Sequence, residues 1–132
     1  MRHILRRAAT TVALAGAMAA ATAGTASASP SAPEIRYGMT GFKVYCVQIG
    51  ISNHQESPNT WTAPDGEFGR NTLSTVKAFQ GNLGLQVDGK VGKNTGGQVL
   101  WGIEHAKVKW GNWTTPWGVP IDNCYQVVPS HF

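Results

Sequence analysis

Charged residues, histidines and cysteines are all scarce in this 132-residue sequence, and each shortage excludes a class of protein. Only 14% of the residues are Asp, Glu, Lys or Arg. No cluster of basic residues follows residue 30, which excludes the basic face that nucleic-acid binding requires. No apolar run after residue 30 approaches the ~20 residues of a membrane span. The length allows one small domain and excludes a two-domain enzyme.

Only four histidines are present, and none of them forms an H-E-x-x-H motif or a similar metal-ligand spacing. We therefore predict neither a metal site nor a cofactor. The three histidines that follow residue 30 are interpreted as surface residues: His54, His105 and His131.

The first 28 residues have the three-part pattern of a secretory signal peptide. Three arginines lie within the first seven residues, an alanine-rich apolar run follows at Ala8–Ala23, and Ala26-Ser27-Ala28 supplies small residues for cleavage after Ala28. We expect a secreted protein, extracellular or associated with the cell wall; the alternative is an uncleaved N-terminal anchor. Cleavage leaves eight basic and seven acidic residues, a net charge of +1.

The sequence holds two cysteines, Cys46 and Cys124. In an exported chain they are expected to form one disulfide. This bond would close most of the mature chain into a loop, which the loop-entropy model values at about 4 to 5 kcal/mol. The alternative makes Cys46 a catalytic thiol, but the oxidising compartment and the lack of a cysteine-specific motif around it favour the disulfide.

An internal repeat follows residue 40. Residues 65–72 (DGEFGRNT) and 88–95 (DGKVGKNT) are identical at five of eight positions. The pattern V-x-x-V-Q at residues 44–48 precedes the first copy, and V-x-x-F-Q at residues 76–80 precedes the second. The connection from Gln to Asp is nine residues longer in the first unit. The extra length therefore lies between Ile49 and Pro64.

Each copy of the eight-residue motif predicts a tight turn. The Asp side chain can accept hydrogen bonds from downstream backbone N–H groups, and the following Gly permits a positive φ. The second Gly allows the chain to reverse, and the apolar residue between the two glycines folds into the core, as Phe68 and Val91 are expected to do. The turn-forming residues are Asp65, Gly66 and Gly69 in the first copy and Asp88, Gly89 and Gly92 in the second.

The spacing of apolar residues predicts three short helices, at residues 41–49, 73–83 and 96–103. A threonine stands four residues before a valine in each unit, so Thr40, Thr72 and Thr95 are candidate N-caps. Three glycines weaken the third helix, each by about 1 kcal/mol. After Ile103 the helical period ends in a segment rich in Trp, Gly and Pro, which predicts an irregular arm that the disulfide ties to the first helix.

The combination of V-x-x-h-Q, D-G-x-h-G-x-x-T, V-K-A-F-Q and a second D-G-x-h-G-x-x-T, where h is hydrophobic, resembles the three-helix type of peptidoglycan-binding domain found attached to bacterial cell-wall hydrolases. The resemblance covers Gly38 to about Leu100. It implies a compact bundle that binds peptidoglycan without altering it. Because this chain has no room for a catalytic domain, a hydrolase partner would be encoded separately. The long first connection and the C-terminal tail depart from the family pattern.

We therefore predict an all-α fold: a compact three-helix bundle with an internal pseudo-repeat, an irregular Trp-rich C-terminal arm and one disulfide. The expected division of the chain is a signal peptide at residues 1–28, an extended leader at 29–36, the peptidoglycan-binding domain at 37–104 and the arm at 105–132.

Peptidoglycan offers carboxylates, amides and sugar faces to a binding site. A cation beside the free N–H groups of a helix start favours a carboxylate, and the candidates are Arg70, Asn71, Lys93 and Asn94. Gln48 and Gln80 occupy equivalent places in the two units. They would hydrogen-bond amides of the ligand or, as an equal alternative, make a structural bond to a neighbouring loop.

Tryptophan presents a rigid flat face and a polar edge, which suits stacking on a sugar. Four tryptophans are candidates either for ligand contact or for packing of the arm: Trp61, Trp110, Trp113 and Trp117. We assign Trp101 to the core.

Two other functions compete with wall binding. A secreted interaction or inhibitor protein would use the same scaffold to present the Trp-rich arm to a protein partner. A small cell-wall hydrolase would use Asp65, Glu67 or Asp88, although no recognised catalytic motif is present.

Overall fold

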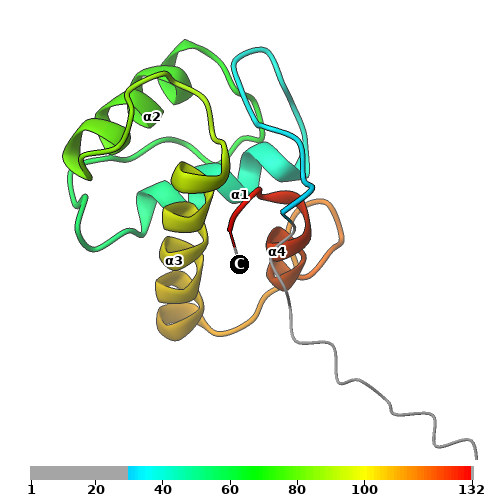
Figure 1. The fold of residues 1–132 in the computed structure, drawn as a ribbon. Helices are drawn as coiled ribbons and strands as arrows, with labels where there is room; N and C mark the ends of the chain where they lie inside the picture. Colours follow the sequence, from blue (N-terminus) through cyan, green and yellow to red (C-terminus); the bar gives the residue numbers. More distant parts are fainter. Residues whose placement is uncertain (1–29, 132) are drawn as a thin grey trace, which may run out of the picture.

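The computed structural model describes residues 30–131. The predicted signal peptide lies outside these residues. The described chain contains four α-helices and one short 3-10 helix (Figure 1): α1 at Phe42–Ser52, α2 at Arg70–Asn82, α3 at Lys93–Trp110, η1 at Ile121–Asn123 and α4 at Cys124–Val127. Three isolated β-bridges are present, and no strand occurs in the described part. The prediction of an all-α fold is confirmed.

The main packing contact joins α1 and α3, and glycines make it close. A Cβ atom on Gly102 of α3 would collide with the carbonyl oxygen of Gly50 in α1. A Cβ atom on Gly50 would collide in turn with Val99. Gly102, one of the glycines that weaken α3 as an isolated helix, therefore allows it to approach α1, because tertiary packing outweighs helix propensity. The helix continues to Trp110 rather than ending at Ile103 as predicted.

The predicted threonine N-caps are wrong. The N-cap residues of the three long helices are Gly41, Gly69 and Gly92, and none of them makes a side-chain cap hydrogen bond. Thr72 and Thr95 lie within the first turns of α2 and α3, where they are buried. Their hydroxyl groups have other partners, as the next subsection describes.

The core lies between the three long helices and includes Phe68 and Val91, the two motif residues that were expected to be buried. Phe68 is 2% exposed and Val91 is fully buried, which confirms their placement. The leader takes part as well: Ile35 is fully buried and exchanges two backbone hydrogen bonds with Val91, of 3.1 and 2.8 Å. The segment before α1 is therefore a packed part of the domain.

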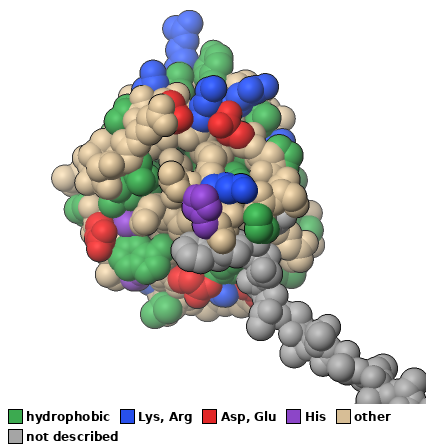
Figure 2. Space-filling view, viewed as in Figure 1, with side chains coloured by type: hydrophobic (Ala, Val, Ile, Leu, Met, Phe, Trp, Pro, Cys, Tyr) green, Lys and Arg blue, Asp and Glu red, His purple; other side chains and the backbone are tan. Residues whose placement is uncertain are grey.

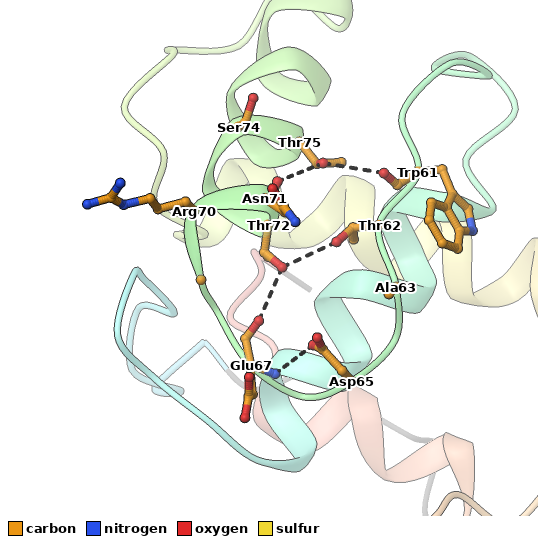
Figure 3. Close-up of a pocket in the computed structure, with 11 residues that line it drawn as sticks. Trp61, Thr62, Ala63, Asp65, Glu67, Arg70, Asn71, Thr72, Ser74 and Thr75 are labelled. Carbon is orange, nitrogen blue, oxygen red and sulfur yellow. Dashed lines mark hydrogen bonds between the residues drawn. The ribbon is translucent and has the colours of Figure 1, made fainter.

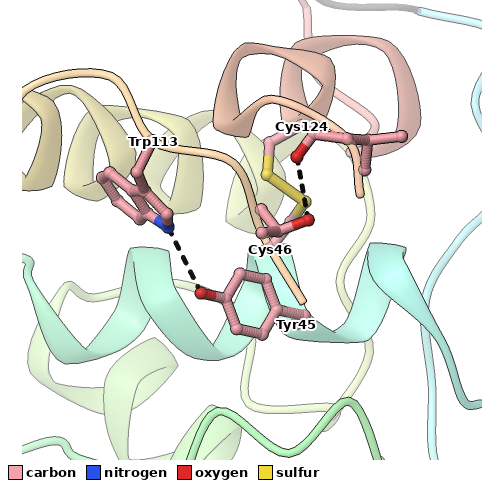
Figure 4. Close-up of a disulfide and its surroundings, with 6 residues drawn as sticks. Tyr45, Cys46, Trp113 and Cys124 are labelled. Carbon is pink, nitrogen blue, oxygen red and sulfur yellow. Dashed lines mark hydrogen bonds between the residues drawn. A yellow bond between two sulfur atoms is a disulfide. The ribbon is translucent and has the colours of Figure 1, made fainter. Parts of the chain in front are cut away.

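The C-terminal arm returns to α1 (Figure 4). Cys46 and Cys124 form the predicted disulfide, with their Cα atoms 5.5 Å apart. Near this bond, the indole N–H of Trp113 donates a hydrogen bond to the hydroxyl of Tyr45, with a donor–acceptor distance of 3.4 Å. The arm is not wholly irregular, since it contains η1 and α4.

Acidic and basic side chains are interspersed on the face shown in Figure 2, without a block of one sign. No helix within residues 30–131 combines the length and the apolar character needed to cross a membrane.

Candidate functional site

The first Asp-Gly turn is organised around the buried amide of Gln48. Its Nε2 atom lies 2.8 Å from Oδ1 of Asp65, 3.1 Å from the carbonyl oxygen of Glu67 and 3.0 Å from the hydroxyl of Thr72. Its Oε1 atom accepts a hydrogen bond of 2.8 Å from the backbone N–H of Gly66. One side chain on α1 therefore fixes both the turn and the start of α2.

The second turn has the same arrangement around Gln80. Its Nε2 atom lies 2.9 Å from Oδ1 of Asp88, 2.9 Å from the carbonyl oxygen of Lys90 and 3.1 Å from the hydroxyl of Thr95. Its Oε1 atom accepts from the N–H of Gly89 at 2.9 Å. We call the turn of residues 65–72 the first corner and that of residues 88–95 the second corner.

Gln48 and Gln80 are both 0% exposed. Their amide groups are occupied inside the two corners, which is the structural alternative that the sequence left open. They are out of reach of a ligand, and the expectation that they hydrogen-bond amides of the wall is corrected on that ground.

The predicted turn geometry is present in both corners. Gly66 and Gly89 each have a φ of +74°, which other residues rarely adopt. Backbone N–H groups donate to Asp65 and to Asp88, both at 2.9 Å. Gly69 is the N-cap of α2 and has a φ of −90°, which does not require glycine. Gly92 is the N-cap of α3 and has the same φ.

Hydrogen bonding lowers the pKa of both turn aspartates. For Asp65 the largest cause is the bond from the N–H of Glu67, followed by the amide of Gln48. For Asp88, burial raises the pKa, but the bonds from Lys90 and Gln80 outweigh it and the net direction is down. Both carboxylates therefore stay ionised and act as acceptors.

A groove of about 530 Å³ opens beside the first corner (Figure 3). One wall is the segment that contains Trp61, and the other is the first part of α2, with Arg70 at its outer edge. Trp61 is 69% exposed. A bond of 3.4 Å from the hydroxyl of Thr75 to the carbonyl oxygen of Trp61 joins the two walls. The groove lining is mostly polar: Trp61, Thr62, Ala63, Asp65, Glu67, Gly69, Arg70, Asn71, Thr72, Ser74 and Thr75.

The longer connection of the first unit creates this groove. Trp61 lies in that extra segment, which has no counterpart between Gln80 and Asp88. The duplicated motif therefore builds two similar turns, and the first has the segment that contains Trp61 beside it.

Both ends of the described chain contact the second corner, and the space beside it is smaller. The hollow there measures about 110 Å³ and includes Glu34 of the leader. The carboxylate of Glu34 lies 3.9 Å from Nζ of Lys90. At the other end, Nε2 of His131 lies 2.7 Å from Oδ1 of Asn94. Of the candidates at this corner, Asn94 thus already has a partner within the chain, and Lys93 lines the small hollow.

The four candidate tryptophans are not gathered in one place. Trp61 lies at the groove, and Trp117 packs over Gly66 on the same corner. Trp113 is half-buried, and its N–H is used by Tyr45. Trp110 lies at the end of α3, where Nζ of Lys109 is 4.8 Å from its ring centroid.

His54 and Trp101 are placed differently from the sequence expectation. His54 is 2% exposed rather than on the surface, and burial lowers its pKa although its bond to Gln98 opposes the shift. Trp101 is exposed rather than in the core, and its ring lies between those of His54 and His105, with centroid distances of 4.5 and 4.1 Å. Because His54 belongs to the extra segment, the repeat gave no signal for its burial.

Among residues 30–131, no group of three or more His, Cys, Asp and Glu side chains is arranged to hold a metal ion.

A family model described as "Putative peptidoglycan binding domain" matches residues 54–98. These residues include both corners and the groove-lining tryptophan, and the match confirms the resemblance drawn from the repeated motif. A search of curated proteins found no match.

Similar solved structures include the N-terminal domain of SleB, which is 27% identical over 55% of this chain and 96% of that one, with a TM-score of 0.47. A peptidoglycan-binding protein from Clostridioides difficile, in complex with glutamine hydroxamate, is 30% identical over 51% of this chain and 40% of that one, with a TM-score of 0.45. A Burkholderia AP3 phage endolysin is 27% identical over 51% of this chain and 24% of that one, with a TM-score of 0.45. The chain thus spans less than half of the last two proteins.

Proposed function

We propose that this protein is a secreted, non-catalytic module that binds peptidoglycan through the groove at the first corner. The observation that carries the proposal is the difference between the two corners. The first has a groove of about 530 Å³ beside an exposed Trp61, whereas the second has a hollow of about 110 Å³ and is contacted by Glu34 and His131. The family match at residues 54–98 supports the class of ligand.

The groove combines the groups that a peptidoglycan ligand requires. Trp61 offers a flat apolar face with a polar edge. Asn71 and Ser74 are exposed and offer hydrogen-bonding groups, and Arg70 offers a cation at the start of α2. Tryptophan and arginine are common among the interface residues that contribute most of the binding energy.

The state of the two turn aspartates supports a binding role for them over hydrolysis. A general acid at neutral pH needs a raised pKa. The pKa values of Asp65 and Asp88 are lowered, and both carboxylates are engaged by the turns that they build.

Sedimentation with purified insoluble cell wall tests the proposal. The native protein is expected to pellet with the wall, and Trp61→Ala or Arg70→Gln should reduce the pelleted fraction without lowering thermal stability. Trp110→Ala is the matched control, because it removes an exposed indole far along α3 from the groove. Loss of binding in the control alone, or a native protein that stays in solution, contradicts the proposal.

A protein-binding function is the second candidate, and one observation favours it. Val108 is 85% exposed and Trp110 is 55% exposed, so the end of α3 presents apolar side chains to solvent. A protein that stays in solution with cell wall but binds a purified wall hydrolase would have this function. A zymogram with cell wall in the gel tests for hydrolase activity.

A further inference from the structure

Trp117 of the arm lies directly against the first corner. A Cβ atom built on Gly66 would fall 2.5 Å from Cζ2 and 2.6 Å from Cη2 of Trp117. The six-membered part of the indole ring therefore rests on the backbone of the turn. The neighbours of Gly66 in sequence, Asp65 and Glu67, both line the groove that contains Trp61. The turn thus has an aromatic ring packed on it and a groove with a second aromatic ring beside it.

The position of Trp117 is fixed by the fold. Its ring packs on that of Tyr45, with centroids 5.1 Å apart and planes inclined at 54°. It lies within a tight loop closed by two backbone hydrogen bonds of 2.9 Å, from Thr115 to Val119 and from Gly118 to Thr115. The disulfide then ties the arm to α1, one residue after Tyr45. A ring held in this way needs little ordering when it meets a ligand.

Trp117 nevertheless keeps a surface for a ligand. It is 41% exposed. Within the described chain its indole N–H has no hydrogen-bond partner, unlike that of Trp113, which donates to Tyr45. The indole N–H of Trp61 is unpaired in the same sense. Both rings therefore offer an apolar face together with a free donor.

The charges of the groove favour sugar over stem peptide. Two carboxylates, of Asp65 and Glu67, line it against one cation, Arg70. The stem peptides of peptidoglycan carry carboxylates, which this balance repels. Sugar rings carry no charge, and their C–H faces pack on aromatic rings while their hydroxyl and N-acetyl groups bond to hydroxyl, amide and carboxylate side chains.

We propose that Trp117 is a second aromatic platform and that Trp61 and Trp117 hold separate sugar residues of one glycan strand across the first corner. This inference rests on the proposed wall-binding function and names its ligand as the glycan strand. The arm and the extra segment of the first unit are the two departures from the family motif, and each supplies one platform.

The test measures binding to glycan strands from which the peptides have been removed, as an insoluble fraction and as soluble oligosaccharides. The native protein should bind stripped and intact wall alike, and should bind long oligosaccharides more tightly than a disaccharide. Trp117→Leu keeps apolar bulk against Tyr45 but removes the aromatic face. It should weaken binding to long oligosaccharides about tenfold, the upper range for one aromatic contact.

Two further variants complete the experiment. Trp117→Tyr keeps a ring with a polar edge and should restore most of the affinity that Trp117→Leu loses. The unfolding temperatures of the two variants are compared as well. If they are equal, a purely structural role of the arm does not predict this recovery of affinity. Trp110→Leu is the matched control and should bind like the native protein.

The outcomes separate the inference from the function that it rests on. Binding to intact wall that vanishes when the peptides are removed overturns the glycan assignment and leaves wall binding in place. Equal affinities of the Trp117→Leu and Trp110→Leu variants overturn the second platform. A native protein that fails to pellet with intact wall overturns the proposed function itself.

Discussion

The Nζ atom of Lys107 lies 2.6 Å from Oδ1 of Asp122, so an ion pair joins α3 to η1 of the C-terminal arm. The hydrogen bond between the two groups raises the pKa of Lys107 and lowers that of Asp122. Asn112 also donates to Asp122. This pair therefore holds the arm in addition to the disulfide.

The ion pair predicts a dependence of stability on pH. Because the pKa of Asp122 is lower in the folded state, its stabilisation is present above its ordinary pKa and is lost as the pH falls through the folded value. We expect Asp122→Asn to lower the free energy of unfolding by about 0.5–1 kcal/mol near neutral pH, since the pair is partly exposed. The difference from the native protein should shrink below about pH 4.

Denaturant unfolding at a series of pH values measures this difference. Glu104→Gln serves as the control, because Glu104 contacts Lys107 at 3.4 Å with about half of its side chain exposed. A deficit of Asp122→Asn that persists unchanged at low pH would falsify the assignment.

The two glycines of the first corner should respond differently to alanine. Gly66→Ala places a Cβ atom at a positive φ and into the ring of Trp117, and we expect a loss of about 1–3 kcal/mol in the free energy of unfolding. Gly69→Ala adds a Cβ atom with no neighbour within 4 Å, at an ordinary φ, and should cost about 1 kcal/mol or less. Because Trp117 is the indole that Gly66→Ala would displace, the intrinsic tryptophan fluorescence should change in the first variant and not in the second. Equal losses would show that the ring does not rest on Gly66.

Replacing the buried glutamines tests the turn network. Gln48→Leu leaves the N–H of Gly66 and the carboxylate of Asp65 without the amide, and unsatisfied buried groups cost about 1–3 kcal/mol each. We expect a loss of about 2–4 kcal/mol in denaturant unfolding. Gln80→Leu in the second corner should cost a similar amount, because its bonds are equivalent.

These two variants also separate stability from binding. Gln48→Leu disturbs the corner beside the groove and should reduce retention on cell wall, whereas Gln80→Leu disturbs the second corner and should not. Equal loss of retention in both would place the ligand elsewhere than the first corner.

Removal of the disulfide should loosen the arm as a unit. The bond joins residues 78 positions apart, and a loop of this size is worth about 4–5 kcal/mol in the entropy model. We expect the double variant Cys46→Ser, Cys124→Ser to melt at a lower temperature and to expose Trp117 more fully to a soluble fluorescence quencher. An unchanged melting temperature under oxidising conditions would contradict this estimate.

The repeated motif was sufficient to predict both corners, because each of its positions has a local role. Asp65 accepts from its own turn, Gly66 has a positive φ, and Phe68 is buried as expected. The disulfide was equally predictable, since only two cysteines exist in the chain.

The predicted helix starts were wrong because the threonine hydroxyls have partners that are distant in sequence. Thr72 was expected to cap α2, but its hydroxyl bonds to the amide of Gln48 and to the carbonyl oxygen of Glu67. The pairing of a distant glutamine with this hydroxyl is a tertiary contact, and helix-start rules consider only neighbours in sequence. The close approach of Gly102 to Gly50 is likewise a tertiary contact that helix propensity does not include.

The difference between the two corners could not be predicted from the repeat. It depends on the extra segment that contains Trp61 and on Glu34 and His131, which lie outside the repeated units and reach the second corner only in the folded chain. The placement of Trp117 over Gly66 is of the same kind, since 51 positions separate the two residues in sequence.

Since Glu34 and His131 both contact the second corner, the chain enters and leaves the folded unit at neighbouring points. Such a unit can be inserted into a surface loop of a carrier protein, because neighbouring ends match the ends of the interrupted loop. The carrier would then lie beside the second corner, and a fluorescent or enzymatic reporter could be joined to either end without being attached next to Trp61.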